Sequence, residues 1–217
     1  PTEKPVYNKP IPAGVTTESI VNHYVEAIGG ADKCANAKTV ETVYEAKMGP
    51  NVLTISESKM APNMSKNSVA MGSMVMQRSA FDGKTGYQEA QGQKKEMTAE
   101  EIAEAQASDE PLNLKDYRSG KLVKIESLDS GDAYVVETEE NTFVYFNIES
   151  GLLVQSKVSQ EGPQGVQEAI TLFNNYQAYD GIKFPTEIVI IGMGPGPLSL
   201  KAKSIIVNSK LSAKDFN

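Results

Sequence analysis

The stretch GDAYVVETEENTFVYFNIESGLLVQSKVSQEGPQGVQEAITLFNNYQAYDGIKFPTEIVII, residues 131–191, decides the fold of this chain. Apolar or β-branched side chains recur in it at every second position, as in Tyr134, Val136 and Thr138. Because side chains alternate between the two faces of a strand, this period of two indicates a sheet with one buried face. Short breaks rich in Gly, Asn and Asp separate the runs, and no segment of helical pattern lies between them. The stretch therefore predicts an antiparallel meander.

Strands are also predicted on both sides of this stretch. They cover residues 40–48, 52–60, 64–71, 74–81, 85–89, 121–128 and 198–203. The total is about ten antiparallel strands. An open sheet of that size curls strongly, so its concave face needs a cover. The loop GMGPGP, residues 192–197, lies between two strands and contains prolines that lack an amide proton, so it is a bend and not a phosphate loop.

Two segments carry the signals of helices, and they are the candidates for this cover. The first is expected between a cap at Thr16 or Thr17 and a Gly-Gly pair. Its apolar residues form one stripe at helical spacing: Ile20, Val21, Tyr24, Val25 and Ile28. The second covers residues 99–107 and opens with a capping box formed by Thr98 and Glu101. A further helical turn is expected over residues 112–117.

The predicted fold class is therefore α+β. A strongly curved antiparallel sheet forms an unclosed barrel, and an N-terminal helix and a short helical insertion cover its concave face. Residues 16–217 are expected to form this one domain. Residues 1–15 contain four prolines and no periodicity, and are expected to form an extended linker.

Composition limits the classes of function. The net charge of −7 comes without a basic patch, so neither nucleic acid nor an anionic membrane surface is an expected partner. No apolar run approaches the ~20 residues of a transmembrane helix. The chain has one histidine, His23, and one cysteine, Cys34, so no zinc site, no HExxH motif and no internal disulfide are expected in a monomer.

No catalytic constellation and no cofactor site are predicted. A Ser-His-Asp arrangement would have to use His23, which lies off the apolar stripe of its helix and is expected at the surface. No GxSxG motif presents a serine. The carboxylates of residues 99–107 are typical of a solvated helix face. A hydrolase built on a pair of carboxylates stays open as a distant alternative, because nothing in the sequence selects one pair.

Methionine is concentrated in one part of the chain. Six of the eight methionines lie across four consecutive predicted strands: Met48, Met60, Met64, Met71, Met74 and Met76. Flexible methionines suit an apolar surface that adapts to varied ligands, but they also fill irregular cores, and both interpretations remain open. On the first, a hydrophobic ligand cavity is lined by Tyr44, Met48, Met60, Met74, Met76, Arg78, Tyr134, Val136, Ile170 and Leu172. Arg78, expected on the same face as Met74 and Met76, holds a ligand head group, reaches solvent at a strand end or pairs with a carboxylate.

Three motifs in order resemble the LolA/LolB-like superfamily, the outer-membrane lipoprotein carriers and lipoprotein-sorting proteins of Gram-negative bacteria. They are AFDGKTGYQ (80–88), TFVYFNIESGLLVQSKV (142–158) and FNNYQAYDGIKFPTEI (173–188), and the resemblance spans about residues 16–210. It implies an unclosed β-barrel with helices in its mouth, a hydrophobic cavity that shields acyl chains, and a location in the periplasm or at the outer membrane. Residues 11–34 look like the start of domains that follow insulinase-like zinc peptidase domains in Bacteroidetes-type proteins.

From this resemblance we expect a non-catalytic domain that binds a hydrophobic small molecule or a lipoprotein acyl chain. We also expect it to accompany an upstream zinc-peptidase domain in the same chain. The alternative is an interaction or spacer domain of such a peptidase, with a concave face filled by its own side chains and no ligand. The volume of the cavity on the concave face separates the two.

Overall fold

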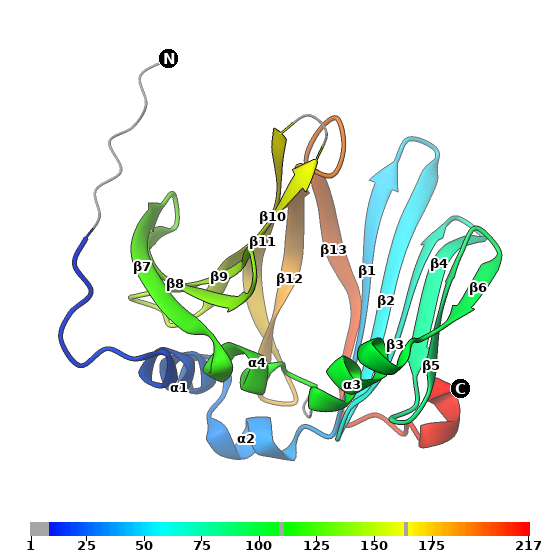
Figure 1. Ribbon diagram of the computed structural model, residues 1–217, viewed down its shortest axis with the longest axis horizontal. Helices are drawn as coiled ribbons and strands as arrows, with labels where there is room; N and C mark the ends of the chain where they lie inside the picture. Colours follow the sequence, from blue (N-terminus) through cyan, green and yellow to red (C-terminus); the bar gives the residue numbers. More distant parts are fainter. Residues whose placement is uncertain (1–8, 109–110, 163–164) are drawn as a thin grey trace.

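One curved antiparallel sheet dominates the computed structural model, which describes residues 9–108, 111–162 and 165–217. Its strands are β1 (Thr39–Met48), β2 (Asn51–Met60), β3 (Met64–Met71), β4 (Met74–Phe81), β5 (Gly86–Ala90), β6 (Gln93–Glu96), β7 (Lys121–Leu128), β8 (Gly131–Glu139), β9 (Thr142–Asn147), β10 (Leu153–Gly162), β11 (Gly165–Tyr179), β12 (Ile182–Ile191) and β13 (Leu198–Val207). The order across the sheet is β6-β5-β4-β3-β2-β1-β13-β12-β11-β10-β9-β8-β7. Pairing of β1 with β13 therefore joins the predicted meander to the N-terminal strands, and the sheet stays open between β6 and β7 (Figure 1).

The described part of the chain contains 13 strands, so the expected number of about ten was wrong. Strand β6 has the sequence QKKE and is exposed throughout, so it carries no apolar alternation. Strand β9 is buried on both faces, because Val144 and Phe146 contribute to one hydrophobic cluster and Tyr145 to another. Both strands lack the period of two that reveals a half-buried strand.

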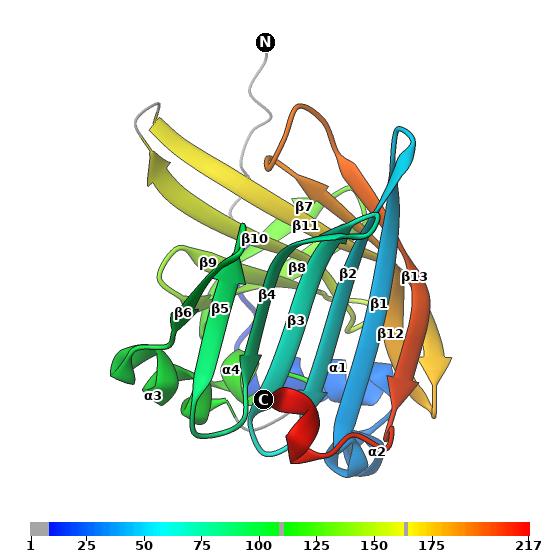
Figure 2. The same ribbon diagram turned by 90° about the vertical axis from the view of Figure 1, so that its right-hand side faces the viewer.

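The helices are α1 (Thr17–Ile28), α2 (Ala31–Asn36), α3 (Ala99–Ala107), α4 (Leu114–Ser119) and a terminal 3₁₀ turn, η1 (Ala213–Phe216). The first four lie at one end of the strands, on the concave side of the sheet (Figure 1). The 3₁₀ turn η1 packs on the opposite, convex side (Figure 2). Thr16 and Ser19 form the capping box of α1, and Thr98 and Glu101 that of α3. Helix α3 buries no side chain, so the cover comes from α1 and from the second part of the predicted insertion, α4, which forms near the turn expected over residues 112–117.

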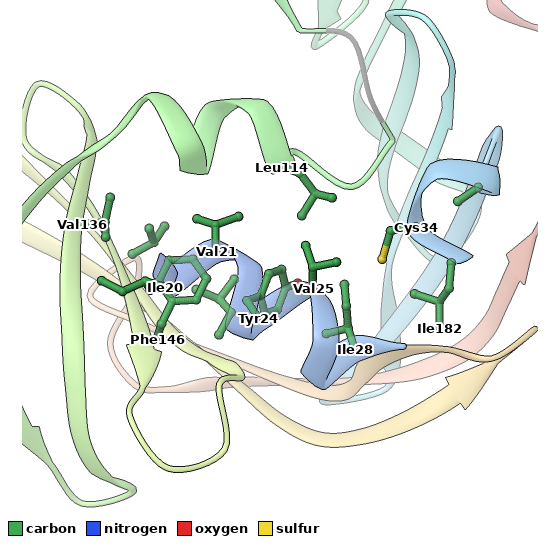
Figure 3. Close-up of a cluster of buried hydrophobic side chains, with 13 residues drawn as sticks. Ile20, Val21, Tyr24, Val25, Ile28, Cys34, Leu114, Val136, Phe146 and Ile182 are labelled. Carbon is green, nitrogen blue, oxygen red and sulfur yellow. The ribbon is translucent and has the colours of Figure 1, made fainter. Parts of the chain in front are cut away.

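The apolar stripe of α1 packs against the sheet as its spacing predicts. Val21 and Ile28 are almost fully buried, and Cys34 of α2 lies in the same cluster as a small apolar side chain (Figure 3). The ring of Phe146 lies 5.3 Å from that of Tyr24 in α1 and 5.6 Å from that of Tyr117 in α4. This aromatic group ties both helices to β9.

A glycine permits the close approach of α1 to the sheet. Gly151, between β9 and β10, has a φ of 71°, and a Cβ at this position would lie 2.9 Å from the carbonyl oxygen of His23. Any other residue would be strained there and would push the turn away from α1. The imidazole of His23 itself is exposed, as expected from its place off the apolar stripe.

Candidate functional site

The strand register defines which side chains share the concave face, here called the inner face. Neighbouring partners in the ladder put these residues on it: Tyr44, Ile55 and Val69 in β1–β3, and Leu198, Ile190, Thr171, Ser156, Val144 and Val136 in β13 to β8. Val136 and Val144 pack under α1, which identifies this face as the one toward the helices. The opposite face is called the outer face.

The inner face has two parts. The first is the core under α1 and α4. The second, here called the open inner face, lies on β1–β3, β12 and β13, with its partly exposed apolar residues Ile55, Val69, Met71, Ile188, Ile190 and Leu198. They surround a buried floor that includes Tyr44 and Leu53. A folded chain normally buries such a contiguous apolar set, so its partial exposure marks a surface suited to an apolar ligand.

Methionines border the open inner face. Met71 pairs with Leu53 on one side and with Met74 on the other. Met74 is 63% exposed, and Met48, at the end of β1, is 45% exposed. These long, flexible side chains can therefore adjust to a ligand without disturbing the packed floor.

Charges are distributed very differently on the two faces. The outer face carries ion pairs between neighbouring side chains: Lys203–Glu45, Arg78–Glu89, Lys157–Glu168 and Lys124–Glu126. On the inner face of β2, Lys59 Nζ lies 3.3 Å from Glu57 Oε1 and donates to Asn113 Oδ1 at 3.2 Å. In the strands β1–β5 and β8–β13, as far as the structure describes them, Lys59 is the one lysine or arginine that the register places on the inner face.

Tyrosines contribute buried hydroxyl groups beside this ion pair. The Tyr44 hydroxyl donates to the carbonyl oxygen of Pro185 at 2.6 Å, and burial, with Glu57 nearby, raises its pKa. Burial raises the pKa of Tyr117 to about 12. Both hydroxyls are therefore neutral donors at physiological pH, and neither is poised as a base.

Five of the ten predicted lining residues lie on the inner face. Tyr44, Met48 and Met74 belong to the open inner face or its border. Tyr134 and Val136 belong to the core under α1, where the helix covers them. The predicted set therefore divides between an accessible surface and a filled one.

The other five residues do not line the open inner face. Met60 pairs with Thr39 and Met64 on the outer face. Ile170 and Leu172 also point outward, opposite Lys157 and Gln155 of β10.

Met76 and Arg78 are displaced by a β-bulge in β4. Val69 pairs with Gln77 and Ala70 with Val75, so Met76 is the extra residue of the bulge. The extra residue reverses the alternation. Arg78 therefore lies on the outer face, where its guanidinium pairs with Glu89 at 2.7 Å, and the alternative of a carboxylate partner was the correct one.

Sequence reasoning missed most of the open inner face. Ile188 and Ile190 share parity in β12, and Leu198 and Leu200 do so in β13, so the period of two was a usable signal for their common face. Lys59 carried no signal, because a lysine beside Glu57 in a strand is typical of a solvated surface. Its position became visible only when the register was known.

Pockets occur at both ends of the inner face. One of about 450 Å³ lies between β10, β11 and the loop after β12, where it includes Val158, Ala169 and Met193. Another of about 420 Å³ lies at the helical end, between α1, α2 and α4. Within residues 9–108, 111–162 and 165–217, no three His, Cys, Asp or Glu side chains are placed to share a metal ion.

The sequence matches no model of a known protein family and no curated protein. Solved structures do match. A LolA superfamily protein from Nitrosomonas europaea superposes with a TM-score of 0.59 at 14% identity, over 94% of this chain and 98% of that one. The fold is LolA-like. A Vibrio parahaemolyticus domain named as an outer membrane lipoprotein-sorting protein gives a TM-score of 0.57 at 12% identity, over 93% of this chain and 97% of that one. A DUF1329 family protein from Desulfovibrio piger gives 0.56 at 11% identity, with the same two coverages.

The LolA-like neighbours agree with the expected architecture of an unclosed sheet with helices on its concave side. At these identities the likeness concerns the fold, and no residue can be transferred by it. Among the described residues, no helix has the length and the apolar character needed to cross a membrane.

Proposed function

We propose that this domain binds an apolar ligand, such as the acyl chain of a lipid or lipoprotein, on its open inner face. The observation that carries the proposal is the contrast between the two faces. The outer face carries ion pairs among its apolar residues, whereas the open inner face gathers partly exposed Ile, Leu, Val and Met side chains around a buried apolar floor. The names of two structural neighbours, a LolA superfamily protein and a lipoprotein-sorting domain, support this choice of ligand.

Three further elements belong to the same proposal. The domain acts in the cell envelope, in the periplasm or at the outer membrane, and binds its ligand without catalysis. It comprises residues 16–217, preceded by a linker over residues 1–15, of which residues 1–8 lie outside the described residues. The third element is an upstream zinc-peptidase domain in the same chain, supported by the resemblance of residues 11–34.

A matched pair of double variants tests the ligand surface. Met71 and Met74 pair with each other on the inner face, and Ala70 and Val75 pair with each other on the outer face of the same hairpin. Met71→Gln/Met74→Gln should weaken binding of a fluorescent fatty-acid probe. Full burial of a methionine contributes about 1.5–3 kcal/mol, so losing half of that at two positions costs on the order of tenfold in affinity or more.

The control variant, Ala70→Gln/Val75→Gln, should bind the probe like the wild-type protein. Equal losses in both variants would place the probe elsewhere and would refute the proposed surface. Circular dichroism must show both variants folded before their affinities are compared.

The alternative function is an interaction or spacer domain that holds no ligand. It is favoured by one observation: the floor residues Tyr44 and Leu53 are each only 7% exposed, so part of the inner face is already filled by the chain itself. A wild-type protein that binds no apolar probe would establish this alternative.

A further inference from the structure

Lys59 is an unusual residue for its position. It lies at the end of β2 nearest to α4, on the same face as Leu53 and Ile55, and its side chain is 22% exposed. A charge in an otherwise apolar face loses hydration, and the chain retains such a charge only when its partners offset the loss. The partners observed are one amide oxygen and one carboxylate oxygen at 3.3 Å.

The polar groups around Lys59 form a definite end to the apolar surface. Asn113 adopts a left-handed conformation with φ 58° immediately before α4 and presents its side-chain oxygen to Lys59. The Tyr117 hydroxyl interacts with the side chain of Asn113, and Glu57 is close enough to raise the pKa of Tyr44. In the other direction along β2, the inner face is apolar through Ile55 and Leu53.

This surface is long enough to hold one acyl chain. Eight residues separate Lys59 from Asn51, at the far end of β2, which corresponds to about 26 Å of extended strand. A single acyl chain spans one leaflet, about half of the ~30 Å hydrocarbon core of a bilayer. A chain of about 15 Å anchored at Lys59 would therefore pass Ile55, about 13 Å along the strand, and its end would approach Leu53 and its partner Met71 at the methionine border.

We infer that Lys59 binds the anionic head group of a single-chain amphiphile whose acyl chain lies along the open inner face. This inference rests on the proposed function. The ammonium group has three N–H donors, one of which is directed at Asn113, so donors remain for a carboxylate. The competing Glu57 side chain is 44% exposed and can turn toward water when the ligand arrives. Arg78 cannot take this role, because it is paired with Glu89 on the outer face.

Two ligands that differ only in charge test the inference. Laurate and lauryl alcohol have the same chain, and each is titrated by calorimetry into the wild-type protein and the variants Lys59→Gln, Lys59→Arg and Glu57→Gln. Lys59→Gln should weaken laurate binding by about tenfold, the scale of one charge-assisted hydrogen bond in a partly exposed site. Lys59→Arg should retain laurate binding. Glu57→Gln should strengthen it by several-fold, since a competing carboxylate is removed.

Lauryl alcohol should bind all four proteins within about twofold, because it offers no charge to Lys59. Unchanged laurate affinity in Lys59→Gln, or an equal loss for both ligands, would overturn the head-group role while leaving the proposed function in place. Failure of the wild-type protein to bind either ligand would overturn the proposed function and this inference together. Thermal unfolding of each variant identifies a loss that comes from misfolding.

Discussion

Replacement of Phe146 by alanine tests how the helices are attached to the sheet. The side chain is 1% exposed and packs against the rings of Tyr24 in α1 and Tyr117 in α4. Truncation of a buried phenylalanine costs about 3–5 kcal/mol, which includes the transfer of the side chain and the cavity it leaves. Because alanine cannot pack against either tyrosine ring, Phe146→Ala should lie near the middle or upper end of this range. A domain with a typical stability of about 5–15 kcal/mol would then keep only part of it.

Urea denaturation followed by circular dichroism measures this change as a shift of the midpoint at constant slope. Phe143→Ala is the matched control, because Phe143 is the same residue on the same strand, faces outward and is only partly buried. The decrease in the free energy of unfolding should be clearly smaller for Phe143→Ala than for Phe146→Ala. A decrease of less than about 1.5 kcal/mol for Phe146→Ala, or equal decreases for the two variants, would refute the described packing of α1 and α4. Ligand affinity of folded Phe146→Ala should be unchanged, since the residue lies under the helices and away from the open inner face.

Three further predictions concern the scaffold. The first prediction concerns high pH. Burial raises the pKa of Tyr117 and of Tyr145 to about 12, above the ordinary value near 10. The two buried, neutral tyrosines therefore contribute fully to the stability of the fold below pH ~10, and this contribution is lost as the pH rises toward 12. Alkaline unfolding followed by tyrosinate absorbance should show the loss. The second prediction concerns low pH. Backbone amides of the following turn lower the pKa of Asp82 in the folded protein, so the stability of the fold should fall as the pH drops below about 4. Asp82→Asn should flatten the dependence of the free energy of unfolding on pH in this range. An unaltered pH dependence would count against the stabilising role of the Asp82 carboxylate. Gly151→Ala should destabilise the domain by at least about 1–2 kcal/mol, from its positive φ and the approach to His23. A melting temperature equal to that of the wild-type protein would contradict this.

The sequence predicted the sheet much better than it predicted the faces of its strands. A period of two is a local property, so it located most strands and the meander correctly. The face that a strand presents depends on every irregularity along it. One inserted residue, Met76, moved Arg78 to the outer face. In β11 a left-handed residue, Asn175, turns Tyr176 inward although Leu172, of the same parity, points outward.

The candidate site was only partly predictable for the same reason. Tyr44 and Met48 follow an unbroken alternation in β1, and they lie where that alternation placed them. The contribution of β12 and β13 depends on the pairing of β1 with β13, which brings together segments about 160 residues apart and is not encoded in local periodicity. The position of Lys59 on the apolar inner face likewise depends on how the strands pair in the sheet.

The most direct test of the proposed function is a titration of the wild-type protein with an environment-sensitive fatty-acid probe, followed by competition with a lipopeptide. The domain should bind the probe saturably, with a dissociation constant of about 1 μM or lower, and the lipopeptide should displace it. Unchanged probe fluorescence in the presence of folded protein would contradict a ligand-binding inner face.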